Sequence, residues 1–182
     1  IVVSSYAAFL VAFVFSGIYL VKYYAERAFE GASSARLATN TGATFPAGVT
    51  ASVGLRRDTP ALEAAAARGN TVAAWFVALP TLAQLDIIVY RAIAIGLPLI
   101  SIGIITGAMW AKEAWGAYWQ WDPKETAALF SWIVYLAYMH LHTRHAWRGM
   151  RTNWVSVLGF VSIVFCYLGV NIWISGLHSY KV

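Results

Sequence analysis

The sequence lacks most of the features that a soluble or secreted domain needs. Cys166 is the only cysteine, so the chain can form no internal disulfide and contains no CxxC-type motif. Charged residues make up only 12% of the chain against 60% hydrophobic residues, too few to cover a water-facing surface. No histidine cluster has zinc spacing, and no Ser/His/Asp arrangement or phosphate-binding loop is visible. With a mean hydropathy of +0.62, the chain is predicted to be a polytopic helical membrane protein.

Long apolar runs define the predicted fold, an all-α membrane bundle with about four spans. Each run approaches the roughly 20 residues that cross a bilayer. The runs are Ile1–Val21, Ala92–Ala111, Thr126–Leu141 and Trp154–Gly176. The predicted organisation is a transmembrane helix at 1–21, a cytoplasmic loop at 22–91 and a core of three spans at 92–182. Because the chain opens on Ile1 in an apolar run, we expect an N-terminally truncated part of a larger bundle.

The stretch between the first two runs differs in composition from the rest of the chain. Residues 30–60 are small, polar and rich in turn formers, which predicts a mobile loop. The sequence "ALEAAAARGN" predicts a short helix that ends at Gly69 and Asn70. Residues 79–92 have leucine and isoleucine at three-residue steps, so we expect an interfacial helix that leads into the second span.

The positions of Lys and Arg predict the orientation. Residues 22–91 carry seven of them and the segment after the third run carries three, whereas the opposite side carries three. Cytoplasmic loops are enriched in these residues, so the segment 113–125 and the C-terminus are predicted to lie outside. His142 and His145, beside arginines, are expected at the inner surface. Although the net charge is +5, the basic residues lie between apolar runs, and we expect no nucleic-acid partner.

The segment 113–125 carries more aromatic residues than an interfacial belt requires. Asp122 is expected to cap the third span, with Pro123 in its first turn and Glu125 near its positive end. This account leaves four aromatic residues unexplained. They are Trp115, Tyr118, Trp119 and Trp121.

Two histidines are candidates for metal binding. His140 lies in the third span, 18 residues or about 27 Å of helix after Asp122. His178 follows the fourth span, on the other side of the membrane, so the two imidazoles predict separate stations. Histidine with dense tryptophan in a membrane suits haem. The structural alternatives are a hydrogen-bonded helix contact for His140 and a loop residue for His178. His140 and His142 point about 200° apart, so only one can face a bundle interior.

The string "WGAYWQWDPKET" resembles the tryptophan-rich WWD signature of cytochrome c assembly proteins, in the system II branch of CcsA/ResC type. The strings "YRAIAIGLPLISIGIITGAMWA", "YMH", "WRG" and "GVNIWISGLHSY" resemble the same branch. The resemblance implies transport of non-covalent haem b across the membrane and its presentation outside for attachment to apocytochrome c. It implies that the outer haem contacts the WWD surface and that two outer histidines ligate its iron, of which His178 is the second. His140 matches the transmembrane histidine of the family and is expected as an iron ligand at the inner station. The residues that the resemblance implicates are Trp115, Gly116, Tyr118, Trp119, Trp121, Asp122, His140 and His178.

The same resemblance implies partners and a location. The partners are a second membrane subunit of the synthase (CcsB/ResB type), apocytochrome c with its CxxCH motif, and a thioredoxin-like thiol reductant. The location is the plasma or thylakoid membrane, with the aromatic segment on the periplasmic or lumenal side. The family's first outer histidine, expected shortly before Tyr6, is not in this sequence. No residue is an evident general acid or base, so whether the chain is itself an enzyme stays open.

Two other functions remain alternatives at this point. The first is a system I protein of the same signature, which presents haem to a chaperone or reduces it through a quinone-linked haem. The second is a membrane transporter or structural subunit that binds no haem.

Overall fold

The computed structural model describes residues 2–41 and 60–169, and this part of the chain is helical with no β-strand. The all-α prediction is therefore confirmed. The chain divides into two compact units. The first unit holds residues 1–17 and 87–182, and the second holds residues 18–86. The aromatic segment and three of the four histidines lie in the described part of the first unit.

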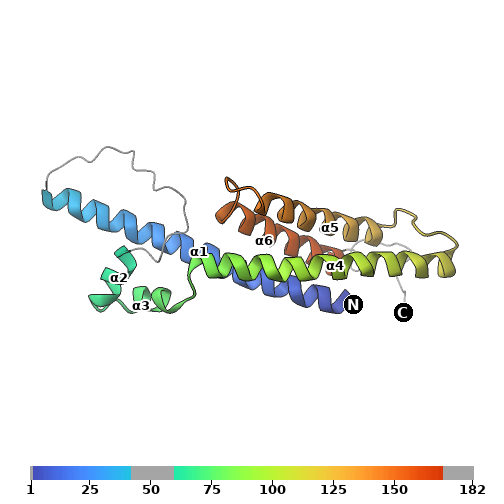
Figure 1. The fold of residues 1–182 in the computed structure, drawn as a ribbon, viewed down its shortest axis with the longest axis horizontal. Coiled ribbons are helices and arrows are strands. Elements are labelled where there is room, and N and C mark those ends of the chain that lie inside the picture. Colours follow the sequence, from blue (N-terminus) through green and yellow to red (C-terminus); the bar gives the residue numbers. More distant parts are fainter. Residues whose placement is uncertain (1, 42–59, 170–182) are drawn as a thin grey trace. The chain divides into compact units, whose positions relative to one another are not determined.

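Six α-helices and one π-helical turn make up the described residues (Figure 1). They are α1 (Val2–Thr41), α2 (Pro60–Ala67), α3 (Thr71–Ala78), α4 (Leu82–Trp115), α5 (Pro123–His142), α6 (Met150–Val164) and η1 (Phe165–Gly169). By length and composition, three stretches could cross a membrane, namely 2–32, 82–115 and 150–168. The remaining expected span, α5, has 20 residues. At 1.5 Å per residue it can cross about 30 Å, although its charged first turn and two histidines make it less apolar.

The helices of the second unit differ in part from the sequence predictions. The predicted short helix is confirmed as α2, and Asn70 after it accepts a 3.1 Å hydrogen bond from Ala73 N to cap α3. The loop expected from residue 30 is wrong as far as Thr41, because α1 continues to that residue. The amphipathic stretch 79–92 forms no separate helix, since α4 begins at Leu82 and runs unbroken into the second apolar run. Residues 42–59 lie outside the described part.

Phe9 and Tyr135 form the centre of the first unit's core. Their rings stack with centroids 3.9 Å apart, and both side chains are fully buried. A glycine borders each ring: a Cβ on Gly96 would lie 2.7 Å from Phe9 Cε1, and one on Gly159 would lie 2.8 Å from Tyr135 Cζ. The stack therefore joins α4, α1, α5 and α6 into one column. The column has no room for an added methyl group at either glycine, as expected for the close packing of protein interiors.

Hydroxyl groups tie the same helices together at α5. Ser162 Oγ donates to Ser131 Oγ at 3.0 Å between α6 and α5. Trp132 Nε1 donates to Ser101 Oγ at 2.8 Å between α5 and α4, three residues after Pro98 inside α4. Buried polar groups are stable in an apolar interior when they are paired in this way. These contacts fix the middle of α5 against α4 and α6.

Candidate functional site

The aromatic segment lies between the end of α4 and the start of α5, and hydrogen bonds fix its two boundaries. α4 stops at Trp115, and Gly116 follows with φ +80°, a conformation that glycine adopts at little cost. The Gly116 carbonyl accepts from Lys112 Nζ at 2.8 Å. At the other boundary, Asp122 caps α5 through a 3.0 Å bond from Lys124 N, and a full capping box is present. The capping role predicted for Asp122 is confirmed.

Glu125 holds the second half of the segment in an unusual shape. Its Oε2 atom accepts from Gln120 N at 2.9 Å and from Asp122 N at 3.3 Å. Trp121, between these two amides, has φ +56° and is the only non-glycine residue with positive φ among the described residues. A bulky side chain in this region is an outlier that costs about 1–3 kcal/mol. Its neighbours must therefore supply the stabilisation that keeps it there.

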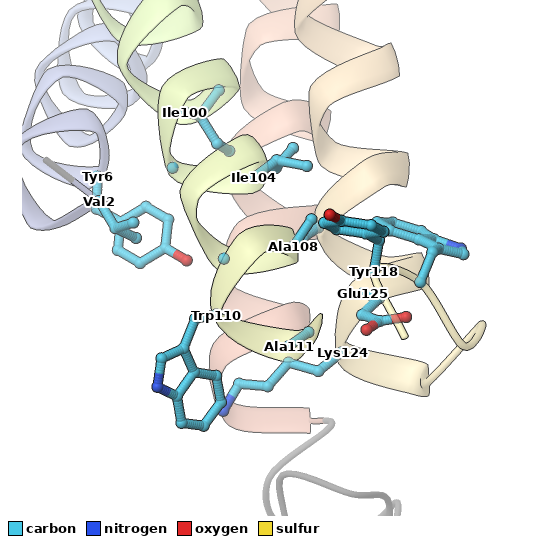
Figure 2. Close-up of a pocket in the computed structure, with 14 residues that line it drawn as sticks. Val2, Tyr6, Ile100, Ile104, Ala108, Trp110, Ala111, Tyr118, Lys124 and Glu125 are labelled. Atoms are coloured by element: carbon cyan, nitrogen blue, oxygen red, sulfur yellow. The ribbon is translucent and has the colours of Figure 1, made fainter. Parts of the chain in front are cut away.

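A cavity of about 340 Å³ opens beside the aromatic segment. Its walls come from the first residues of α1, the second half of α4, the segment itself and the first two turns of α5, and most of the lining residues are apolar. Tyr118, Trp119 and Trp110 supply its large rings, and Tyr6 supplies a phenol from α1. Figure 2 shows the Lys124 side chain extending from α5 toward the Trp110 indole along the cavity wall. The volume is within the usual range for small-molecule sites.

The structure sorts the predicted aromatic residues into different places. Tyr118 and Trp119 line the cavity, and Trp115 packs edge-on against Trp110 with centroids 5.0 Å apart. Trp121 is not a lining residue: it is 70% exposed, and its ring packs at nearly a right angle to that of Trp119, at a centroid distance of 5.8 Å. Gly116 and Asp122 shape the backbone and do not line the cavity either. Not all of the predicted surface is therefore available to a single ligand inside the cavity.

Sequence reasoning missed three residues that line the cavity. Trp110 was assigned to the second span, Tyr6 to the first, and Lys124 only to the charge count. For Trp110 a signal was available, because its position in the last turns of an apolar run put an indole within reach of the aromatic segment. Tyr6 and Lys124 come from helices whose arrangement the sequence does not give, so nothing local identified them.

The other end of α5 carries the histidines. His140 is exposed, and its Nε2 atom lies 3.5 Å from Arg144 Nη2. His142 is only 6% exposed, and its ring stacks on Tyr90 at 4.6 Å and lies 5.7 Å from Tyr138. The Tyr90 ring of α4 covers His142, so its side chain packs within the protein. His145 is exposed.

The two ends of α5 are too far apart to form one site. The helix is unbroken from Pro123 to His142, so His140 lies about 27 Å from Asp122 along it. His178, the other predicted ligand, lies outside the described residues. Among the described residues, no group of three or more His, Cys, Asp and Glu side chains could hold a bare metal ion.

The cavity lining matches haem in part. Its walls offer aromatic and aliphatic surface to a flat ring system, and Lys124 offers a cation to a carboxylate, but Glu125 adds a carboxylate of its own to the lining. The described lining contains no histidine, so an iron ligand would have to come from elsewhere in the protein.

Comparison with known proteins gives the family. A family model described as "Cytochrome C assembly protein" matches residues 1–178. The chain belongs to the cytochrome c assembly family. Its resemblance to CcsA-type proteins is confirmed by several relatives that carry the name "Cytochrome c biogenesis protein CcsA". The match also supports the membrane location that the apolar helices indicate.

Three of these CcsA relatives illustrate the extent of the similarity. The protein of Synechococcus sp. is 52% identical over 104 residues, which cover 57% of this chain and 34% of the relative. That of Guillardia theta is 54% identical over 99 residues, covering 54% and 33%. That of Thermosynechococcus vestitus is 48% identical over 132 residues, covering 69% and 41%. The chain thus spans about a third of the length of the curated relatives it matches.

Proposed function

We propose that the protein carries haem b across the membrane and presents it, at the aromatic segment, for covalent attachment to apocytochrome c. Membership of the cytochrome c assembly family supports the process. The observation that carries the site is the cavity, which places Tyr118, Trp119 and Trp110 around one space at one end of α5. This proposal explains why segment 113–125 carries more aromatic residues than an interfacial belt requires.

The two ends of α5 are proposed as two stations for haem. The balance of Lys and Arg favours an outer position for the aromatic segment and an inner position for His140. His140 is exposed in the described part, so its imidazole is open to a ligand or to a further segment of the full protein. His178 is proposed as an iron ligand of the outer haem, because it follows the last span on the side of the aromatic segment.

The cavity residues have distinct roles in this proposal. Tyr118 and Trp119 contact the flat faces of the haem and keep water from them, while Lys124 holds a propionate. Haem supplies the vinyl groups, and each apocytochrome thiol adds across one vinyl double bond: the sulfur bonds to carbon and the proton ends on the neighbouring carbon. Nothing is oxidised in this addition. Holding the vinyl group beside the thiol is then the protein's main contribution. The proposed partners are a second synthase subunit, apocytochrome c and a thioredoxin-like thiol reductant.

Spectroscopy on the full-length protein, purified with its second subunit, tests the proposal. We expect the absorbance spectrum of a reduced b-type haem. Trp119→Ala should lower the retained haem about tenfold, or about 1.4 kcal/mol, because a large ring contact is lost. Trp154→Ala, which removes an exposed indole from α6, is the matched control and should retain haem. A colourless wild-type complex, together with normal cytochrome c maturation in His178→Ala, would show that the proposal is wrong.

A further inference from the structure

The backbone at Trp121 needs an explanation beyond helix capping. An ordinary capping box uses one bond from the glutamate side chain back to the amide of the capping residue. Here that bond is Asp122 N to Glu125 Oε2 at 3.3 Å. The shorter bond, from Gln120 N at 2.9 Å, is additional, and the two amides flank Trp121 on either side. The Glu125 carboxylate therefore connects the amides on either side of Trp121, the one non-glycine residue with positive φ in the described part of the chain.

Further contacts hold the carbonyl side of the same residue. Thr126 Oγ1 donates to Trp121 O at 3.4 Å, and Thr126 N donates to Asp122 O at 2.9 Å in the first turn of α5. The left-handed conformation of Trp121 is thus supported by bonds to the amides before and after it and to its own carbonyl. A bulky residue keeps such a conformation only where its surroundings impose it.

Two indoles on this segment point to different places. Trp119 lines the cavity, whereas Trp121, two residues later, is 70% exposed. In an extended segment, residues two apart point the same way, so both rings would turn to the cavity side. The turn at Trp121 breaks that pattern. The segment consequently offers one indole inside the cavity and another outside it.

We propose that Glu125 is a positioning residue for haem presentation: its carboxylate bridges the Gln120 and Asp122 amides and so directs the Trp121 indole out of the cavity. This inference rests on the proposed function, because it takes Trp121 to be part of the haem-presenting surface. The competing explanation is that Glu125 serves only to cap α5, and that the direction of Trp121 has no consequence for haem.

Hydrogen exchange tests the bridge without any reference to haem. In the full-length protein with its second subunit, Glu125→Ala should speed exchange of the Gln120 and Asp122 amides about tenfold, as expected for loss of bonds to a charged acceptor. Glu125→Gln keeps an acceptor oxygen and should retain most of the protection. Glu63→Ala is the matched control, because Glu63 is an exposed acidic residue in the first turn of α2, outside segment 113–125. Equal exchange in Glu125→Ala and wild type would overturn the proposal.

A double-mutant comparison tests the positioning role. Haem content and the yield of haem-stained cytochrome c should fall at least about fivefold in Glu125→Ala, recover in Glu125→Gln, and stay unchanged in Glu63→Ala. In a Trp121→Ala background, Glu125→Ala should cause no further loss, because the ring that it positions is absent. A second loss of the same size would mean that Glu125 acts through the cap or the cavity, and would overturn the inference.

The remaining outcomes separate this inference from the proposed function. If Trp121→Ala lowers haem presentation and Glu125→Ala does not, the positioning role of Glu125 is wrong while the proposed function stands. If neither substitution changes haem content or cytochrome c yield, Trp121 has no role in haem presentation. Glu125 then has no such residue to position, and the inference is wrong. If the wild-type complex holds no haem at all, the proposed function fails, whereas the exchange result still reports on the bridge.

Discussion

The substitution Gly159→Ala tests the packed column at the centre of the first unit. The added Cβ would lie 2.8 Å from Tyr135 Cζ, and ordinary contact begins at 3.4 Å, so the ring must move by about 0.6 Å. It has little room to do so, because Tyr135 stacks on Phe9 at 3.9 Å and a Cβ on Gly96 would come within 2.7 Å of Phe9. The substitution should therefore strain both rings.

The expected magnitude follows from two opposing effects. Alanine in a helix interior is about 1 kcal/mol more favourable than glycine. Overpacking of a core costs about 1–3 kcal/mol. The clash involves a fully buried ring that cannot swing aside, so we expect the cost to exceed the gain and Gly159→Ala to destabilise the protein by about 1 kcal/mol.

Denaturation of the purified full-length protein by sodium dodecyl sulfate, followed by circular dichroism, measures this effect. Gly107→Ala is the control: nothing lies within 4 Å of its added Cβ, so it should be neutral or stabilising by up to about 1 kcal/mol. Phe9→Leu should reduce the cost of Gly159→Ala, because a smaller side chain lets the Tyr135 ring move. If Gly159→Ala were as stable as Gly107→Ala, the packed column would be refuted.

Three further predictions concern α5 and its two ends. Trp132→Phe should cost about 1 kcal/mol in the same denaturation assay, because Ser101 Oγ loses its 2.8 Å partner, whereas an unchanged stability would contradict that bond. Trp121→Gly should be more stable than Trp121→Ala by about 1 kcal/mol, since glycine accepts φ +56° and alanine does not; equal stabilities would contradict the left-handed backbone. His140→Ala should deplete haem at both stations, whereas His142→Phe should retain it, because a ring is kept in the buried stack. A normally loaded outer site in His140→Ala would contradict transfer from the inner station to the outer one.

The start of α5 shows what the sequence can predict well. Asp122, Pro123 and Glu125 lie next to one another in the chain, and a capping box depends only on local geometry. The three residues therefore predict the helix start without knowledge of any other element. The bond from Gln120 N to Glu125 was not predicted, because it depends on the direction in which the chain enters the cap.

The errors in the prediction have different physical causes. Residues 30–41 contain Gly31 and several small polar residues, yet Ala, Arg and Leu among them favour a helix, and one glycine costs only about 1 kcal/mol. Composition alone could not decide that balance. For His140 and His142, helix geometry shows that they point in different directions, but only the position of Tyr90 on α4 determines which one is covered.

The cavity could not be predicted because its walls come from three helices and the segment between two of them. Periodicity identifies an apolar face, but gives neither the neighbour of that face nor the gap between them. Tyr6 and Lys124 are 118 positions apart in the numbering and still line one space. The sequence predicted only that the rings of segment 113–125 needed a ligand or a partner.

The unbroken course of α5 has a mechanical consequence. A continuous α-helix resists compression, so a displacement along its axis at one end is passed to the other end almost undiminished. The cap at Asp122, the bridge from Glu125 and the imidazole of His140 all belong to this one rod. The contacts of Ser131, Trp132 and Tyr135 tie this rod to α6, α4 and α1, so an axial displacement would have to break them. The helix therefore acts as a spacer that keeps His140 about 27 Å from the cap at Asp122.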